Sequence, residues 1–235
     1  MRHLTRRDAI LMTGTGIAAG LFGGLSEDLA QAAQCGPDIS HGDRTKKKVA
    51  LTFHGAGDST IATEIFGIAN STKSGITVMA IGSWAISNSK LITGLLKDGH
   101  EVGNHTLNHK TMTRLTFKQA NAEVTGGKRA LEKVIGTSRT FFRPSGTPKS
   151  NSIIRTAAAN SGYRNCITYD VDSLDYQDPK PQKIIEKTLK EIQAGSIVSL
   201  HLGHKNTVTA LPKLIQGIKD LGLEMVTVSE LLGKP

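Results

Sequence analysis

The sequence predicts an α/β protein built on a parallel sheet, because short β-branched runs alternate with helical patterns along most of the chain. Strands are expected over 49–53, 76–81, 101–103, 140–143, 165–171, 196–202 and 225–228. Helices are expected over 60–70, 90–97, 116–135, 151–160, 179–193 and 207–221. Nearly continuous apolar runs such as 197–200 indicate strands that are buried on both faces. Successive β/α units of this kind form either an open doubly wound sheet or a closed barrel.

Local signals set the ends of the expected helices. The longest helix carries apolar residues near the helical period and stops at Gly136, and Gly162 and Gly222 end two others. Pro181 is tolerated because it falls in the first turn of its helix.

Polar clusters at the ends of the expected strands favour the barrel. Three of them, 54–58, 172–175 and 201–204, close a strand, and a fourth, 103–109, follows the strand that ends at Val102. In a barrel the carboxyl ends of parallel strands ring one cavity, so these clusters would meet there. No GxGxxG motif follows the first strand, so dinucleotide binding has no support.

The fourth cluster reads Gly103-Asn104-His105-Thr106-Leu107-Asn108-His109 and holds two imidazoles four residues apart. On a helical turn such positions share a face, so both rings can reach one divalent cation. An HxxxH pair alone is a modest signal, and a surface or capping role accounts for it equally well. The other clusters are what favour a metal site.

Residues 1–32 are expected to be a signal that is removed on export. Thr5-Arg6-Arg7-Asp8-Ala9-Ile10-Leu11 is typical of a twin-arginine signal, and Ala30-Gln31-Ala32 offers a cleavage site. The apolar run between them, 10–25, is shorter than the roughly 20 residues that span a membrane. An uncleaved anchor is therefore the weaker alternative. A lipoprotein attached through Cys35 is weaker still, because Gln34 stands where a small residue is required.

The predicted organisation is a signal peptide over 1–32, an N-terminal tail over 33–47 and one domain over 48–235. The protein is expected to leave the cell by the twin-arginine route and to be secreted or associated with the cell wall. Cys35 and Cys166 would then form a disulfide in an oxidising compartment, or else remain one buried and one exposed thiol.

The net charge of +9 belongs to the mature chain, because the leader holds equal numbers of acidic and basic residues. A basic exported protein favours anionic partners such as those of the cell envelope. Nucleic acid is not expected as a partner, since the basic residues are scattered and form only one run, Lys46-Lys47-Lys48. A monomer is expected.

Taken in order, the polar clusters resemble the motifs of the NodB-type polysaccharide deacetylases, carbohydrate esterase family 4, from about Lys48 to Leu232. The resemblance implies a distorted (β/α)7 barrel that uses one divalent metal to remove N- or O-acetyl groups from glycans. The family motif H-[ST]-x-x-H is intact, which implies that His105 and His109 bind the metal. Neutral imidazoles suit Zn²⁺, the first choice here, with Co²⁺ or Ni²⁺ as alternatives.

The first family motif, T-F-D-D-G-P, is altered to Thr52-Phe53-His54-Gly55-Ala56-Gly57-Asp58. In the family the first Asp is the general base and the second is a metal ligand. The favoured interpretation makes His54 the base, since an imidazole with a pKa of about 6.5 can accept a proton at neutral pH, and makes Asp58 the ligand. A three-histidine metal site with Asp58 as base is one alternative, and an impaired site is the other.

The third motif appears as Phe142-Arg143-Pro144-Ser145-Gly146. By resemblance Arg143 orients the base carboxylate. With a histidine as base, it would instead hold Asp58 or the acetyl carbonyl. Substrate contacts are expected from Ser145 and from Pro144, with the backbone N–H that follows Pro144 facing the oxyanion.

The fourth and fifth motifs supply the expected acid. In Asp172-Ser173-Leu174-Asp175-Tyr176, resemblance assigns Asp175 to tuning the catalytic acid and Tyr176 to the acetyl pocket. In Ser199-Leu200-His201, it assigns His201 to protonating the leaving amine and Leu200 to the substrate.

The sequence therefore predicts an exported metal-dependent deacetylase that acts on an acetylated glycan, either peptidoglycan or a chitin-like oligosaccharide. A non-catalytic glycan- or envelope-binding barrel is one alternative, favoured by the altered first and third motifs. A metal-dependent hydrolase of another non-peptide C–N bond is the other. It is favoured by the small number of aromatic residues that could stack on sugars.

Overall fold

The structure is a computed structural model that describes residues 34–136 and 141–233. The predicted signal peptide, 1–32, lies outside the described residues. The described residues all belong to one compact unit.

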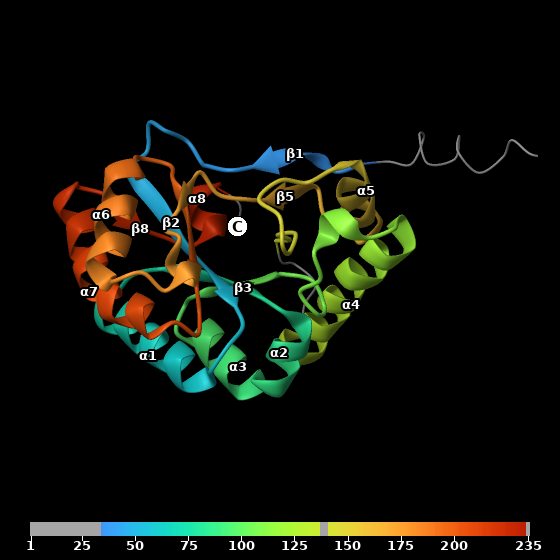
Figure 1. Cartoon of the computed structure of the whole chain (residues 1–235), viewed down its shortest axis with the longest axis horizontal. Coiled ribbons are helices and arrows are strands. Elements are labelled where there is room, and N and C mark those ends of the chain that lie inside the picture. Colours follow the sequence, from blue (N-terminus) through green and yellow to red (C-terminus); the bar gives the residue numbers. More distant parts are fainter. Residues whose placement is uncertain (1–33, 137–140, 234–235) are drawn as a thin grey trace, which may run out of the picture. The chain divides into compact units, whose positions relative to one another are not determined.

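The main sheet is parallel and has its centre at β2 (Lys48–Gly55), which runs through the middle of Figure 1. Its strands follow the order β4-β3-β2-β7-β6, and β8 pairs with the start of β2. The other strands are β3 (Ile76–Ala80), β4 (Glu101–Asn104), β6 (Val171–Asp172), β7 (Ile197–His201) and β8 (Glu224–Met225). Every ladder of this sheet is parallel, as the alternation of strands and helices predicts.

A second, two-stranded sheet pairs β1 (Gly36–Ile39) with β5 (Asn165–Ile167). Phe142 links the two sheets through parallel bridges to Asn104 and Cys166. Among the described residues no ladder joins β5 to β6, so the strands form a distorted barrel that is not closed.

Three expectations about these strands need correction. The N-terminal tail predicted over 33–47 contains β1, which forms the separate two-stranded sheet with β5. The strand predicted over 165–171 is split into β5 and β6 by a turn to the next sheet. The strand predicted over 140–143 is reduced, within the described residues, to the isolated bridges of Phe142.

The helices surround the strands of this unit, as Figure 1 shows for α1, α2, α3, α4, α6 and α7. Six of them agree with the predicted helices to within a few residues, and the short helices α2 and α8 were not predicted. The helices are α1 (Ser59–Ser71), α2 (Gly82–Ser87), α3 (Ser89–Lys97), α4 (Phe117–Ile135), α5 (Ser152–Asn160), α6 (Pro181–Glu191), α7 (Lys205–Asp220) and α8 (Val228–Leu231). None of the described helices is long and apolar enough to cross a lipid bilayer.

Capping residues fix both ends of α4. The Thr116 side chain accepts a hydrogen bond from the backbone N–H of Gln119, and the Gln119 side chain accepts one from the backbone N–H of Thr116, which forms a capping box. At the other end, Gly136 adopts a left-handed conformation with φ of 71°, which a glycine adopts at little cost.

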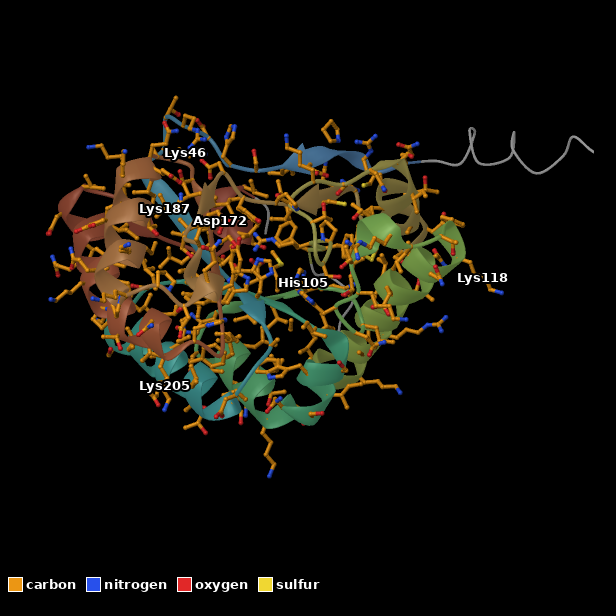
Figure 2. The ribbon with its side chains drawn as sticks, in the orientation of Figure 1. Lys46, His105, Lys118, Asp172, Lys187 and Lys205 are labelled. Atoms are coloured by element: carbon orange, nitrogen blue, oxygen red, sulfur yellow. The ribbon has the colours of Figure 1, made fainter. Side chains whose placement is uncertain are left out.

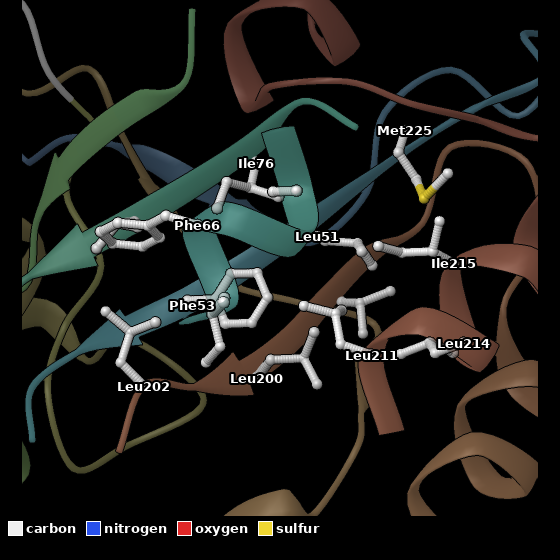
Figure 3. Close-up of a cluster of buried hydrophobic side chains, with 14 of the residues drawn as sticks. Leu51, Phe53, Phe66, Ile76, Leu200, Leu202, Leu211, Leu214, Ile215 and Met225 are labelled. Carbon is white, nitrogen blue, oxygen red and sulfur yellow. The ribbon is translucent and has the colours of Figure 1, made fainter. Parts of the chain in front are cut away.

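The largest apolar cluster lies between the main sheet and the helices around it, and Figure 3 shows part of it. Leu51 and Phe53 on β2, Ile76 on β3 and Leu200 on β7 have no exposed surface. Burial of each such side chain stabilises the fold by roughly 1.5–3 kcal/mol. This core holds the central strands in one register.

That register brings polar residues from distant parts of the sequence to one end of the barrel. His54 on β2 lies opposite His201 on β7, and Asp172 on β6 lies opposite Ser199. Asn104, the last residue of β4, lies opposite Ala80 at the end of β3. The polar clusters at the carboxyl ends of these strands therefore meet, as the barrel prediction requires.

Cys35 and Cys166 lie side by side across the second sheet. Their sulfur atoms are 3.7 Å apart, and both thiols are buried and free. The alternative of an exposed tail thiol is therefore wrong, and the disulfide stays a prediction.

Gly127 tests how tightly α4 packs on the strand ends. A Cβ at this position would lie 2.2 Å from Asn104 Oδ1 and 2.8 Å from the backbone of Thr106. We expect Gly127→Ala to lower the free energy of unfolding by about 1–3 kcal/mol, because the backbone must move to admit the methyl group. The matched control is Gly67→Ala in α1, where nothing lies within 4 Å. The control should leave stability unchanged or raise it by up to about 1 kcal/mol. Equal unfolding curves for the two variants in urea would contradict this account.

Candidate metal and catalytic site

Three imidazoles meet at the carboxyl ends of the central strands. One ring nitrogen each from His54, His105 and His109 can be chosen so that all three lie within 4.8 Å of one another. His54 Nδ1 lies 2.9 Å from His105 Nε2, and the ring centroids of His105 and His109 are 4.9 Å apart. Nitrogen ligands of a tetrahedral Zn²⁺ stand about 3.3 Å apart, since each Zn–N bond is about 2.0–2.1 Å. The cluster therefore suits one divalent ion.

His105 is the most buried of the three residues, and a backbone carbonyl fixes the orientation of its ring. Its Nδ1 lies 2.9 Å from the backbone carbonyl oxygen of Arg143, which can only accept a hydrogen bond. The Nδ1 atom therefore carries the proton, and the lone pair of Nε2 points toward His54 and the shared space. This is the orientation that a metal ligand requires.

The segment that carries His105 and His109 is a loop, and the helical turn expected for it is absent. Thr106 and His109 have positive φ angles of 68° and 58°. This conformation is unfavourable for a β-branched residue such as Thr106. The positive φ angles at Thr106 and His109, and not a helical turn, bring the two rings together.

Buried hydrogen bonds hold Thr106 in its strained conformation. Asn104 Oδ1 accepts from the Thr106 backbone at 2.9 Å, and the Thr106 hydroxyl lies 3.0 Å from that of Ser145. Further along the loop, Glu123 accepts from the backbone of Asn108 at 2.8 Å. Three segments of the fold, β4, the loop at Ser145 and α4, thus hold the loop that carries the two rings.

His54 stands at the end of β2, and both its ring nitrogens have partners. Nδ1 faces His105, and Nε2 lies 3.1 Å from the hydroxyl of Ser199 on β7. Its ring also stacks on that of His201, with centroids 4.3 Å apart and planes 9° from parallel. His54 is therefore fixed within the cluster.

Gly55 shows why the altered first motif cannot supply the usual second acid. A Cβ at this position would lie 2.8 Å from Ala80 Cα and 2.8 Å from Val78 Cγ1. Strand β3 therefore packs directly on the Gly55 backbone and leaves no room for a side chain. The place that a metal-ligating Asp takes in the family's motif is closed here.

Asp58 does not join the cluster, which corrects its predicted role as a metal ligand. It is exposed, and its carboxylate accepts from the backbone of Thr60 at 2.8 Å as the N-cap of α1. The Gly55-Ala56-Gly57 segment does not fold back, because Gly57 packs against Gly203 of the neighbouring loop. The third imidazole of the cluster comes from His54, as in the alternative that predicts three histidines.

Arg143 also differs from its predicted role, because it contacts no carboxylate among the described residues. Its guanidinium is buried and donates to the Thr52 hydroxyl and to the carbonyl oxygens of Ile167 and Thr168, at 2.9, 3.3 and 3.0 Å. It lies 5.5 Å from the centre of the Tyr169 ring. Burial without an anionic partner lowers the pKa of Arg143 to about 10. Arg143 ties strands together and places a positive charge beside the imidazoles.

The three rings are held in the neutral form by their surroundings. Burial is the largest cause that lowers the pKa values of His54 and His105 well below their usual range, and neighbouring rings and Arg143 lower them further. Burial and His201 also lower the pKa of His109. Neutral imidazoles have the free lone pairs that a metal ion needs.

His201 and Asp175 form the pair expected of an acid and its partner. His201 Nδ1 lies 2.7 Å from Asp175 Oδ1, while Asp175 Oδ2 accepts from the His201 backbone and from the Thr207 hydroxyl, each at 2.8 Å. Asp175 has no exposed surface, so these contacts are shielded from solvent. The Nε2 atom of His201 is left for contact with a substrate.

An open cavity of about 340 Å³ lies over the imidazoles. Of the residues predicted to touch substrate, Pro144 and Tyr176 line it, and Tyr176 is 47% exposed. Ser145 and Leu200 do not line it. Ser145 is buried beneath it and bonds the Lys110 carbonyl at 2.6 Å, and Leu200 points into the apolar core. The residues around the cavity are His54, His109, Pro144, Gly146, Thr147, Pro148, Tyr169, Asp172, Tyr176 and His201.

Sequence reasoning missed several residues of this site. Asp172 and Tyr169 line the cavity, and Asn104 and Glu123 support the histidine loop. Asp172 lay within a recognised motif, so its position at a strand end was a usable signal. Glu123 had none, since it comes from the middle of α4 and approaches the loop only in the folded chain.

Residues 41–166 match the family model for polysaccharide deacetylases, which is more than half of the chain. The chain belongs to the polysaccharide deacetylase family. It is 31% identical over 191 residues to a peptidoglycan-N-acetylglucosamine deacetylase of Bacillus cereus, covering 80% of this chain and 89% of that relative. It spans only 60% and 39% of two longer relatives from Bacillus subtilis.

Solved structures of polysaccharide deacetylases have the same fold. One is the T48 deacetylase with substrate, with a TM-score of 0.72 and 30% identity, covering 81% of this chain and 94% of that one. Another is a mutant of BA3943, described as a CE4 family pseudoenzyme with restored enzymatic activity. Its TM-score is 0.76 and its identity 25%, covering 83% of this chain and 70% of that one. The predicted family and fold class are confirmed.

Asp58 and His54 can be separated by their effects on metal binding and stability. We expect Asp58→Ala to lower the free energy of unfolding by about 1 kcal/mol through loss of the helix cap, and to leave zinc affinity unchanged. We expect His54→Ala to weaken zinc binding by more than about 100-fold, since removal of a ligand costs more than removal of a group that supports one. Competition titration with a chromophoric chelator measures the zinc affinity of each variant, and urea denaturation measures the free energy of unfolding. Weaker zinc binding by Asp58→Ala would restore the original assignment.

The buried histidines also predict a pH dependence of stability. The folded pKa values of His54 and His105 lie below the unfolded value of about 6.5, so the unfolded chain binds more protons below that pH. Their contribution is therefore complete above about pH 6.5 and is lost as the pH falls. For chelator-treated protein we expect a shallower pH slope in His105→Asn than in the wild type, by up to about 1.4 kcal/mol per pH unit. Urea denaturation at several pH values measures this, and equal slopes would contradict it.

Proposed function

We propose that this chain is an exported metal-dependent deacetylase that hydrolyses N-acetyl groups of a cell-wall polysaccharide of the peptidoglycan kind. The observation that carries the proposal is that His54 and His109 of the histidine cluster line the same cavity as His201. The deacetylase relatives support the substrate class, since the Bacillus cereus relative is named for peptidoglycan N-acetylglucosamine.

His54, His105 and His109 would hold one divalent ion, with Zn²⁺ as the first choice and Co²⁺ or Ni²⁺ as alternatives. When bound, such an ion polarises the acetyl carbonyl and makes the attacking water more acidic. Tyr176 and Pro144 form walls of the cavity against which the acetyl group can pack.

His201 has the geometry of the acid that assists departure of the amine. Asp175 holds its Nδ1, so Nε2 presents the proton to the leaving nitrogen as the C–N bond breaks. The backbone N–H that follows Pro144 was expected to face the oxyanion, but it belongs to Ser145, which has no exposed surface and does not line the cavity. In this mechanism the chain would hold the ion, orient the acetamide and supply one proton.

Export by the twin-arginine route and a position at the anionic cell envelope complete the proposal. They rest on the leader motif and on the net charge of +9. A disulfide between Cys35 and Cys166 would fit an oxidising compartment, since the two sulfur atoms already lie 3.7 Å apart.

A second candidate is a barrel that binds glycan without hydrolysing it. The observation in its favour is that neither acid of the family's first motif is present, since His54 and Gly55 occupy their places. One structural neighbour is described as a pseudoenzyme of the same family.

Acetate release separates the two candidates. We expect the zinc-loaded protein to release acetate from acetylated chitooligosaccharides or peptidoglycan fragments and to lose this activity with a chelator. His201→Asn should lower kcat by roughly 10²–10⁴-fold with zinc content unchanged, because only the proton donor is removed. The exposed His41, changed to Asn, is the control. Zinc binding without acetate release from any of these substrates would favour the non-catalytic barrel.

A further inference from the structure

The proposed mechanism lacks a group that takes the proton of the attacking water. Both ring nitrogens of His54 are engaged, by His105 and by Ser199, and Gly55 has no side chain. Asp58 caps α1 outside the cavity, and both oxygens of Asp175 serve His201 and its neighbours. None of these four residues is available as a base.

Asp172 is the only carboxylate among the described residues that line the cavity. It ends β6, opposite Ser199 of β7, and the Ser199 hydroxyl lies 3.1 Å from His54 Nε2. In Figure 2, Asp172 and His105 are labelled within the ring of helices, whereas Lys118 lies at its edge. Asp172 lines the same cavity as His54, His109 and His201.

One oxygen of Asp172 is used to fix the side chain, and the other is left for the cavity. Oδ1 accepts from the backbone of Leu174 at 3.1 Å, which holds the turn where Leu174 has a φ of 56°. The structure gives Oδ2 no hydrogen-bond partner within 34–136 and 141–233. A carboxylate that lines the cavity, with one oxygen anchored and the second without a partner among the described residues, is positioned to accept a proton.

We propose that Asp172 is the general base of this chain and replaces the aspartate missing from the first motif. The inference rests on the proposed function. Asp172 Oδ2 takes one proton from water as the water oxygen bonds to the acetyl carbon, and the π electron pair of the carbonyl moves to its oxygen. That pair re-forms the carbonyl as the C–N bond breaks, and the electron pair of the C–N bond goes to nitrogen, which takes a proton from His201. The products are the free amine and acetic acid, which ionises to acetate; Asp172 then gives its proton to solvent and His201 regains one from solvent.

Asp172→Asn is the variant that tests the proposal, because Asn keeps Oδ1 and with it the hydrogen bond to Leu174. Asp178→Asn is the matched control, since Asp178 is an exposed acid nearby that does not line the cavity. We expect Asp172→Asn to lower kcat for acetate release by at least about 100-fold with KM and zinc content nearly unchanged. Asp178→Asn should remain within about twofold of the wild type. Activity of Asp172→Asn within about threefold of the wild type would overturn the proposal.

A binding experiment tests Asp172 even if the wild type releases no acetate. Acetohydroxamic acid gives up a proton when it binds a metal, whereas acetate has none to give. Calorimetry on the zinc-loaded proteins should show hydroxamate binding weakened at least about tenfold in Asp172→Asn and acetate binding equal or tighter. Equal weakening of both ligands indicates a structural role and overturns the proposal, as does unchanged binding of the hydroxamate.

The two experiments distinguish the failure of each claim. A wild type that releases no acetate, together with selective loss of hydroxamate binding in Asp172→Asn, overturns the deacetylase function and supports Asp172 as a proton acceptor. An active wild type with an equally active Asp172→Asn overturns only the role of Asp172. Absence of binding by either ligand in the wild type overturns both.

Discussion

The hydrogen bond from His105 Nδ1 to the carbonyl oxygen of Arg143 is the interaction on which the site depends. It fixes which nitrogen of the buried ring carries the proton and turns the other nitrogen toward His54. The carbonyl is itself well placed, because the Arg143 guanidinium is tied to oxygens of Thr52, Ile167 and Thr168. Strand packing thereby determines the tautomer of a single imidazole.

Charge balance distinguishes this chain from the motif that its family resemblance describes. Two acids are replaced by His54 and Gly55, and among the residues that the structure describes the buried Arg143 has no anion beside it. Burial, with the positive charge of Arg143 as a further cause, lowers the pKa values of His54 and His105 and favours their neutral forms. A divalent ion held by three neutral ligands keeps its full charge, which strengthens its pull on a bound carbonyl or water. Loss of the acid residues therefore changes the chemistry of the site and leaves three neutral imidazoles that could hold a metal ion.

Strain in the histidine loop connects the site to the rest of the fold. Thr106 adopts a φ of 68° only because Asn104, Ser145 and the close approach of Gly127 surround it. A loop held in this way moves little when a ligand arrives, which preserves the spacing of the two rings. The same contacts connect Gly127, which does not line the cavity, to the histidine loop.

The sequence alone determined the alternation of strands and helices, the parallel sheet, the family and the pairing of His201 with Asp175, because these depend on local periodicity and on short motifs. It could not decide between His54 and Asp58, since the choice depends on whether the loop after β2 folds back, and packing of Gly57 on Gly203 prevents this. It also missed that Ser145 and Leu200 lie beneath the cavity, because motif membership does not reveal which way a side chain points. Tertiary packing decided those questions, since only the folded backbone sets which neighbouring atoms leave room for a side chain.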